Sequence, residues 1–138
     1  MMKILKIFLP IIGLVLFSCT DTNNGLMCTE EYRMLTVTIY NSEMEPVILT
    51  DYYTLKTSTG EIIDFKPENQ YIDSIYTING TYILFTDSKM AEASKSGTEF
   101  RFKGFIDTVL VVNKPFIIRN DGCHIELVSG NSNIILEN

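Results

Sequence analysis

The stretch Leu35-Thr36-Val37-Thr38-Ile39-Tyr40 decides the fold class of this chain of 138 residues. Apolar Leu35, Val37 and Ile39 alternate with residues that tolerate water, and β-branched side chains predominate. A period of two places every second side chain on the same face of a strand. We therefore predict a strand here, with one face buried against a core.

Similar short segments fill the rest of the chain, each bounded by turn-forming residues. We predict further strands at residues 52–57, 61–65, 71–78, 81–86, 100–105, 107–112, 116–119, 123–128 and 133–136. Asn79-Gly80 predicts a two-residue hairpin turn, and residues 87–97 predict a loop that crosses between sheets, or a short helical turn. Frequent turns between short strands indicate an all-β fold. We predict an antiparallel sandwich of seven to nine strands, Ig-like or transthyretin-like.

The first 18 residues predict a leader rather than part of the fold. Lys3 and Lys6 accompany an uncharged, largely apolar run from residue 7 to residue 17. A basic start followed by an apolar run of this length is typical of a secretory signal peptide. The run is too short for a membrane span, which needs about 20 apolar residues. A buried strand or helix at the start of the domain is the alternative.

Leu16-Phe17-Ser18-Cys19 resembles the bacterial lipobox. The resemblance implies that Cys19 receives a diacylglycerol, that residues 1–18 are removed, and that the new amine is acylated. Residues 19–27 are then the lipidated cysteine and a flexible tether, because TDTNNG carries no hydrophobic side chain. Several acyl chains would hold the protein on the outer membrane, on its periplasmic or surface face. An ordinary leader that ends in an ordinary cysteine is the alternative.

The remaining cysteines are Cys28 and Cys123. Disulfides persist outside the cytoplasm, so we predict that these two pair, which stabilises the fold by about 4–5 kcal/mol in the chain-entropy model. A metal pair or a free nucleophile is the alternative, but each needs a histidine, and His124 is the only one. Neighbouring side chains in a strand point to opposite faces. We therefore expect no dyad of Cys123 and His124.

Charge and motifs exclude several function classes. The chain has a net charge of −6, and removal of Lys3 and Lys6 with the leader leaves 9 basic and 17 acidic side chains, net −8. Nucleic acids require clustered Lys and Arg, and no such run exists. No serine lies in a G-x-S-x-G motif, and no phosphate or calcium loop is present. We expect no catalytic residue, no metal and no cofactor.

Tyrosines gather in the first half of the domain. Aromatic faces can hold sugars and peptides, so Tyr52, Tyr53, Tyr71 and Tyr76 are candidate binding residues. Alternating tyrosines on a strand are more often half-buried. Tyr52 and Tyr53 are successive in a predicted strand, so only one of them can face the core.

The segment LTVTIYNSEMEPVIL, residues 35–49, resembles the start of carboxypeptidase-regulatory-like and related Ig-like domains. Their pattern is an alternating strand, a polar turn with glycine, and Pro-Val; Met44 stands near the usual glycine. With the lipobox, the early cysteine and the late DGCHIELVSG, the chain resembles small lipoproteins of Bacteroidota. This resemblance implies a β-sandwich domain over residues 28–138. It also makes Ser74 and Thr108 candidate O-glycosylation sites, because each follows an aspartate and precedes a hydrophobic residue.

Taken together, these features predict a lipid-anchored binding or scaffolding module of the cell envelope, accessory to a partner protein or a glycan. A small lipoprotein inhibitor of a hydrolase is the alternative. A long protruding loop at residues 87–97 would favour the inhibitor, and a flat sheet face lined by tyrosines would favour a glycan. An enzyme would need a pocket that gathers carboxylates around His124, or a metal.

Overall fold

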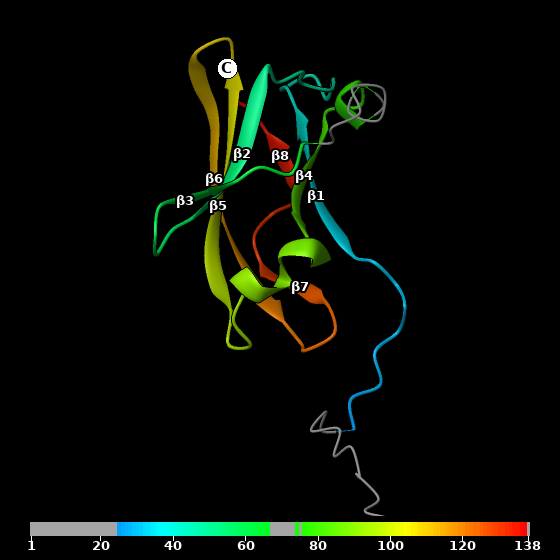
Figure 1. Cartoon of the computed structure of the whole chain (residues 1–138). Helices are drawn as coiled ribbons and strands as arrows, with labels where there is room; N and C mark the ends of the chain where they lie inside the picture. Colours follow the sequence, from blue (N-terminus) through cyan, green and yellow to red (C-terminus); the bar gives the residue numbers. More distant parts are fainter. Residues whose placement is uncertain (1–24, 67–73, 75, 138) are drawn as a thin grey trace, which may run out of the picture.

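The computed structural model describes residues 25–66, 74 and 76–137, which form eight strands in two packed sheets (Figure 1). The strands are β1 (Met34–Tyr40), β2 (Asp51–Lys56), β3 (Glu61–Ile63), β4 (Thr81–Thr86), β5 (Thr98–Ile106), β6 (Val109–Asn120), β7 (Ile125–Ser129) and β8 (Asn133–Ile135). The predicted all-β sandwich of seven to nine strands is confirmed.

One layer is a three-stranded sheet in the order β4-β1-β8. The alternating sequence that opens the domain is β1, with Val37 and Ile39 fully buried. This strand pairs antiparallel with β4 but parallel with β8. The sheet is therefore mixed, whereas the sequence predicts antiparallel pairing throughout.

The other layer is a five-stranded sheet in the order β3-β2-β5-β6-β7. Its strand β6 is one continuous strand of 12 residues, where the sequence predicts two strands separated at residues 113–115. The polar residues there pair with β5 on one side, and Pro115 lies opposite Arg101. β7 pairs only with Ile117–Asn120, so Pro115 lies where β6 has no second partner among the described strands. A proline is tolerated at such a free side.

The core fills the space between the two sheets. Its largest fully buried side chains come from both layers and include Tyr82, Phe85, Phe100, Phe102 and Phe116. Polar atoms inside it are paired, as buried polar groups require. The hydroxyl of Tyr82 donates to the carbonyl of Val47 at 2.8 Å and accepts the N–H of Leu49 at 2.7 Å. Thr54 ties the sheets together by donating to the carbonyl of Leu84 at 2.7 Å.

The strand predicted at residues 71–78 and the hairpin predicted at Asn79-Gly80 are wrong for the residues that the structure describes. Ser74, Tyr76 and Thr77 are helical, and the N–H of Ile78 donates to the carbonyl of Ser74 at 3.1 Å. Gly80 follows this turn at φ +66°, where an added Cβ would lie 2.6 Å from the Ile39 carbonyl oxygen. An Asn-Gly pair suits a helix end as well as a hairpin, because both need left-handed backbone.

Residues 87–97 cross from one sheet to the other, as predicted, and begin with the 3₁₀ helix η1 (Asp87–Glu92). This segment is packed against the sandwich. Ala93 is buried, and the side-chain amide of Asn120 donates to the carbonyl oxygens of Ala93 at 2.6 Å and Met90 at 3.3 Å. The segment therefore does not form the protruding loop that the inhibitor hypothesis requires.

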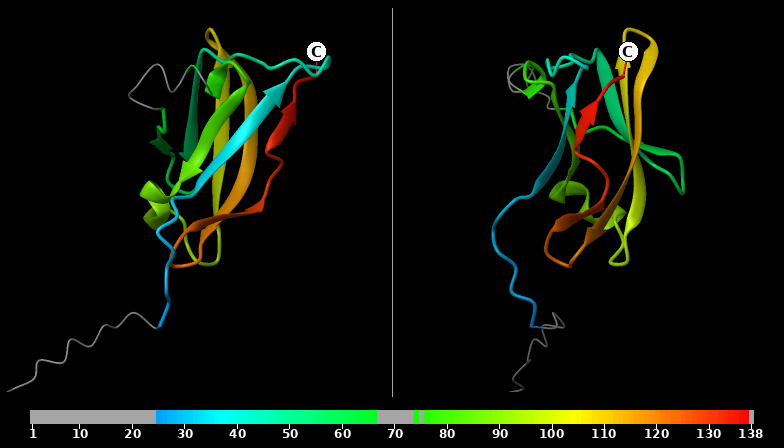
Figure 2. Two further views of the ribbon diagram at one scale, coloured as in Figure 1. Left: turned by 90° about the vertical axis from the view of Figure 1, so that its right-hand side faces the viewer. Right: turned by 180° about the vertical axis from the view of Figure 1, so that it is seen from behind.

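An extended arm of residues 25–33 precedes β1 and is drawn in blue in Figure 2. It leaves the sandwich at the end opposite the C-terminal end of the chain. The turn after β1 carries Met44 at φ 64°. Glycine adopts this left-handed backbone more readily than methionine, because it has no Cβ atom.

Candidate functional site

The disulfide between Cys28 and Cys123 confirms the predicted pairing. The two Cα atoms lie 5.2 Å apart, although the residues are 95 positions apart in sequence. It joins the N-terminal arm to the turn that leads into β7. Because both sulfur atoms are bonded to each other, the metal pair and the free nucleophile are ruled out for these cysteines.

The carboxylate of Asp87 lies beside this disulfide and binds three parts of the chain. Its Oδ2 accepts the backbone N–H of Arg33 and lies 2.8 Å from Nδ1 of His124, while Oδ1 accepts the backbone N–H of Ile125 at 2.9 Å. Burial raises the pKa of Asp87, but these hydrogen bonds and the imidazole outweigh it and hold the pKa below its ordinary value. A charged carboxylate thus fastens the arm, η1 and the start of β7.

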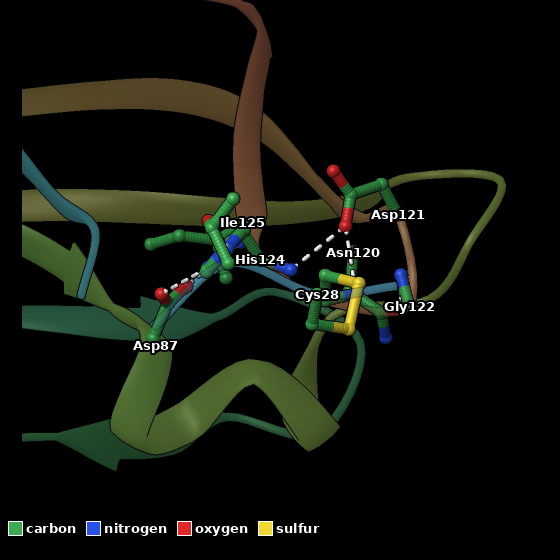
Figure 3. The surroundings of a disulfide bond; sticks show 9 residues. Cys28, Asp87, Asn120, Asp121, Gly122, His124 and Ile125 are labelled. Atoms are coloured by element: carbon green, nitrogen blue, oxygen red, sulfur yellow. Dashed lines mark hydrogen bonds and ion pairs between the residues drawn. A yellow bond between two sulfur atoms is a disulfide. The ribbon is translucent and has the colours of Figure 1, made fainter. Parts of the chain in front are cut away.

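Asp121 stabilises the turn that precedes β7 and contains Cys123 and His124 (Figure 3). Its Oδ1 accepts the backbone N–H groups of Cys123 at 2.8 Å and His124 at 2.7 Å. The hydrogen bonds from His124 and Cys123 lower the pKa of Asp121. Cys123 and His124 therefore lie in a turn, and β7 begins only at Ile125. The strand geometry assumed in the sequence-based argument against a dyad does not apply.

His124 forms the centre of a hydrogen-bonded relay. Its side chain is buried, with 6% of the residue exposed. Nε2 lies 3.0 Å from the hydroxyl oxygen of Thr29, on the arm, and Nδ1 faces Asp87. We call Thr29, His124, Asp87 and the disulfide the N-terminal clasp.

Sequence reasoning missed Thr29 and Asp87 as partners of His124. The available signal was the disulfide itself: Thr29 follows Cys28 and His124 follows Cys123, so pairing the cysteines brings their neighbours together. The position of Asp87 gives no comparable signal, because it depends on how η1 crosses the end of the sandwich.

A pocket of about 280 Å³ opens beside the clasp. Thr29 and His124 line it together with the disulfide, and its other walls include Leu26, Met27, Arg33 and Asp121. Apolar residues and charged residues of both signs thus line the pocket around the exposed Thr29.

The four tyrosines predicted to bind a ligand differ in where they lie. Tyr52 is 4% exposed and packs against Tyr82 and Phe102, so it belongs to the core and is withdrawn as a binding residue. Tyr53 faces the opposite side of the sheet, as the alternation requires. Tyr76 is half-buried in the helical turn, and Tyr71 lies outside the described residues.

Tyr53 belongs to an apolar group on the outer face of the five-stranded sheet. Its ring lies 5.6 Å from that of Phe105, and Leu110 pairs with Phe105 on the next strand. Tyr53 and Phe105 are partly buried, while Leu110 is 42% exposed. We call these three residues the outer-face cluster. Lys103 pairs with Tyr53 in the ladder between β2 and β5, so the two side chains leave the same face of the sheet.

An open groove separates β6 from β8. Two adjoining hollows of about 440 and 480 Å³ share Lys114 and Ile135 as lining residues. In this part of the sandwich, the described residues pair β6 only with β5 and β8 only with β1. Val111, which follows Leu110 of the outer-face cluster on β6, lines one part of this groove.

The two candidate glycosylation sites are both exposed. Thr108 lies in the two-residue turn between β5 and β6, and Ser74 lies in the helical segment. The neighbours of Ser74 in its predicted motif, residues 73 and 75, are outside the described part, as is Cys19.

Within the described ranges, no helix is long and apolar enough to cross a membrane. The same residues contain no group of three or more His, Cys, Asp and Glu side chains arranged to hold a metal ion. Comparisons with protein-family models, curated proteins and solved structures find no match for this chain.

Proposed function

We propose that this protein is a lipid-anchored module of the cell envelope that binds a glycan through the outer-face cluster. The observation that carries the proposal is the pair of aromatic rings, Tyr53 and Phe105, on a sheet face that no described strand or helix covers. A soluble domain buries most of its aromatic surface, so rings left on an uncovered face are candidates for ligand contact.

The polar surroundings of the cluster suit a sugar. Lys103 lies opposite Tyr53 on the same face, and the neighbouring Arg101 donates to the side-chain oxygen of Asn113 at 2.9 Å. Ring faces can pack against the apolar face of a sugar, while an amine and an amide can bond to its hydroxyl groups.

The position of the cluster favours presentation away from a membrane. Phe105 and Leu110 lie next to the β5–β6 turn, at the end of the sandwich opposite the N-terminal arm (Figure 1). With a lipid on Cys19 and the arm fixed at Cys28, nine residues span the distance, which is at most about 30 Å when fully extended. The clasped end would then face the membrane and the cluster would face outward.

We favour glycan binding over inhibition of a hydrolase because the crossing segment, residues 87–97, is packed against the sandwich. An inhibitor of the expected kind needs a loop that enters a partner's active site, and η1 with the following residues is held by Asn120 instead.

A glycan array tests the proposal, with the chain from residue 20 onward, which contains the complete described fold. The expected result is retention of at least one envelope glycan class by the wild-type protein and loss of it in Tyr53→Ala and Phe105→Ala. Tyr32→Ala is the matched control, since Tyr32 is an exposed tyrosine on the arm. Equal retention by all four proteins would remove the cluster as the binding site.

A further inference from the structure

We propose that Thr29 is a nucleophile, activated by His124 and Asp87, that accepts acyl groups from short-chain carboxylic esters. This goes beyond the proposed glycan binding, and it replaces the sequence-based expectation that the chain has no catalytic residue. From the sequence, an enzyme would need a pocket that gathers carboxylates around His124. Asp87 and Asp121 both bond to His124, and Asp121 also lines the pocket.

The three side chains form a continuous relay in the order that acyl transfer requires. Oγ1 of Thr29 lies 3.0 Å from Nε2 of His124, and Nδ1 of the same ring lies 2.8 Å from Oδ2 of Asp87. A hydroxyl, an imidazole and a carboxylate within hydrogen-bond distance define a nucleophile, its general base and the group that orients the base.

The hydrogen bonds around Asp87 determine which nitrogen of His124 is the base. The lowered pKa of Asp87 keeps its carboxylate charged, so Oδ2 can only accept, and Nδ1 must carry a hydrogen. In the neutral ring Nε2 then has a lone pair, and the Thr29 hydroxyl donates to it. This is the tautomer that can remove the hydroxyl proton.

The relay runs from a buried end to an exposed one. Only 7% of the His124 side chain and 12% of the Asp87 side chain are exposed, whereas Thr29 is exposed at the pocket. A purely structural hydrogen bond needs no access for a ligand. Here the exposed Thr29 lines a pocket of about 280 Å³, together with apolar Leu26 and Met27, which is room for a short acyl group.

Arg33 is the group that would stabilise the negative charge on the reacting oxygen. The nearby backbone N–H groups of Arg33 and Ile125 are bonded to Asp87, and those of Cys123 and His124 to Asp121. Arg33 lines the same pocket as Thr29, and its positive charge helps to lower the pKa of Asp121, another lining residue. A fixed positive charge there would lower the energy of the tetrahedral intermediate.

The proposed reaction transfers the acyl group to Thr29 and then to water. The Thr29 hydroxyl proton moves to Nε2 of His124 while Oγ1 bonds to the ester carbonyl carbon. The intermediate then breaks its bond to the alcohol oxygen, which leaves with the proton from His124. Water attacks the acyl-threonine in the same way and releases the carboxylic acid.

The disulfide sets the geometry of the relay, because Thr29 and His124 are the residues that directly follow its two cysteines. Reduction would free the arm from the turn and separate the hydroxyl from Nε2. Reactivity is therefore expected to depend on the oxidised state.

The test uses the chain from residue 20 onward with p-nitrophenyl acetate and a fluorophosphonate probe. We expect ester hydrolysis and one probe adduct on the peptide that contains Thr29. Thr29→Ala and His124→Gln should each lower the hydrolysis rate at least about 100-fold, which is the contribution of a positioned base. Thr29→Ser should keep the activity, and reduction of the wild-type protein should abolish it.

Thr57→Ala is the matched control, because Thr57 is also an exposed threonine and donates to a carboxylate, that of Glu99. It should react like the wild type. The proposal is overturned if wild-type hydrolysis does not exceed that of Thr29→Ala, or if the adduct forms on another residue. Because Thr29 is exposed, Thr29→Ala should keep the wild-type unfolding temperature, which separates lost chemistry from lost folding.

Discussion

The N-terminal clasp and the outer-face cluster lie at opposite ends of the sandwich and are held in different ways. In the clasp, a disulfide and the partly buried carboxylate of Asp87 join three segments that are far apart in sequence. In the outer-face cluster, Tyr53, Phe105 and Leu110 contact each other across neighbouring strands and remain partly exposed. The clasp should therefore dominate stability, and the cluster should affect it little.

Replacing both cysteines of the disulfide by serine should cause the largest loss of stability. The disulfide closes a loop over 95 positions, and the chain-entropy model predicts a loss of about 4–5 kcal/mol in the free energy of unfolding. Urea denaturation of the double Cys28→Ser, Cys123→Ser variant measures it. A loss below about 1 kcal/mol would show that the arm contributes little to the fold.

Asp87→Ala should have the next largest effect, about 3 kcal/mol. The change removes the acceptor for the N–H groups of Arg33 and Ile125 and leaves the buried ring of His124 without its carboxylate. Unsatisfied buried donors cost about 1–3 kcal/mol each. Water can bond to some of these groups at the clasp, because this end of the sandwich is partly open, and so reduces the total cost. Denaturation of this variant, compared with Asp107→Ala at an exposed turn, checks the value. Equal losses would contradict the role of Asp87.

Acid should weaken the clasp selectively. The pKa of Asp87 is below its ordinary value of 3.8 in the folded protein. Its stabilising contribution is therefore complete above the unfolded pKa and is lost as pH falls through the folded pKa. Unfolding free energies measured between pH 5 and about pH 2 should fall less steeply in Asp87→Asn than in the wild type. Identical slopes would mean that another carboxylate governs acid stability.

The smallest effect on stability should come from Tyr53→Ala, about 1 kcal/mol or less, because the ring is only partly buried. Its neighbour supplies a sharp contrast: Tyr52→Ala removes a ring that is 4% exposed, and such a cavity costs about 3–5 kcal/mol. Thermal unfolding of the two variants should show this order. The reverse order would mean that the two faces of β2 are assigned wrongly.

The sequence predicts the parts of this molecule that depend on local periodicity. The alternation in β1 and the opposite orientations of Tyr52 and Tyr53 both follow from a period of two. The pairing of Cys28 with Cys123 is predicted from the expected export of the chain and from the number of cysteines, because the lipobox resemblance leaves two of them for the domain.

Features that depend on long-range packing cannot be predicted from local sequence patterns. Asn79-Gly80 satisfies a helix end as readily as a hairpin, so its left-handed preference cannot choose between them. Asp87 meets His124 only because η1 crosses the end of the sandwich, and the parallel pairing of β1 with β8 depends on how the last residues return. No local pattern of residues encodes these contacts.

A calorimetric titration of one array-selected glycan into the wild type, Tyr53→Ala and Tyr32→Ala decides whether the outer-face cluster is the binding site. Unfolding is recorded on the same samples. We predict that Tyr53→Ala binds the glycan at least about tenfold more weakly, a change of about 1.4 kcal/mol in binding free energy, while it unfolds almost as the wild type does. Tyr32→Ala should bind as the wild type. Unchanged affinity in a folded Tyr53→Ala protein would contradict the assignment of the outer-face cluster as the binding site.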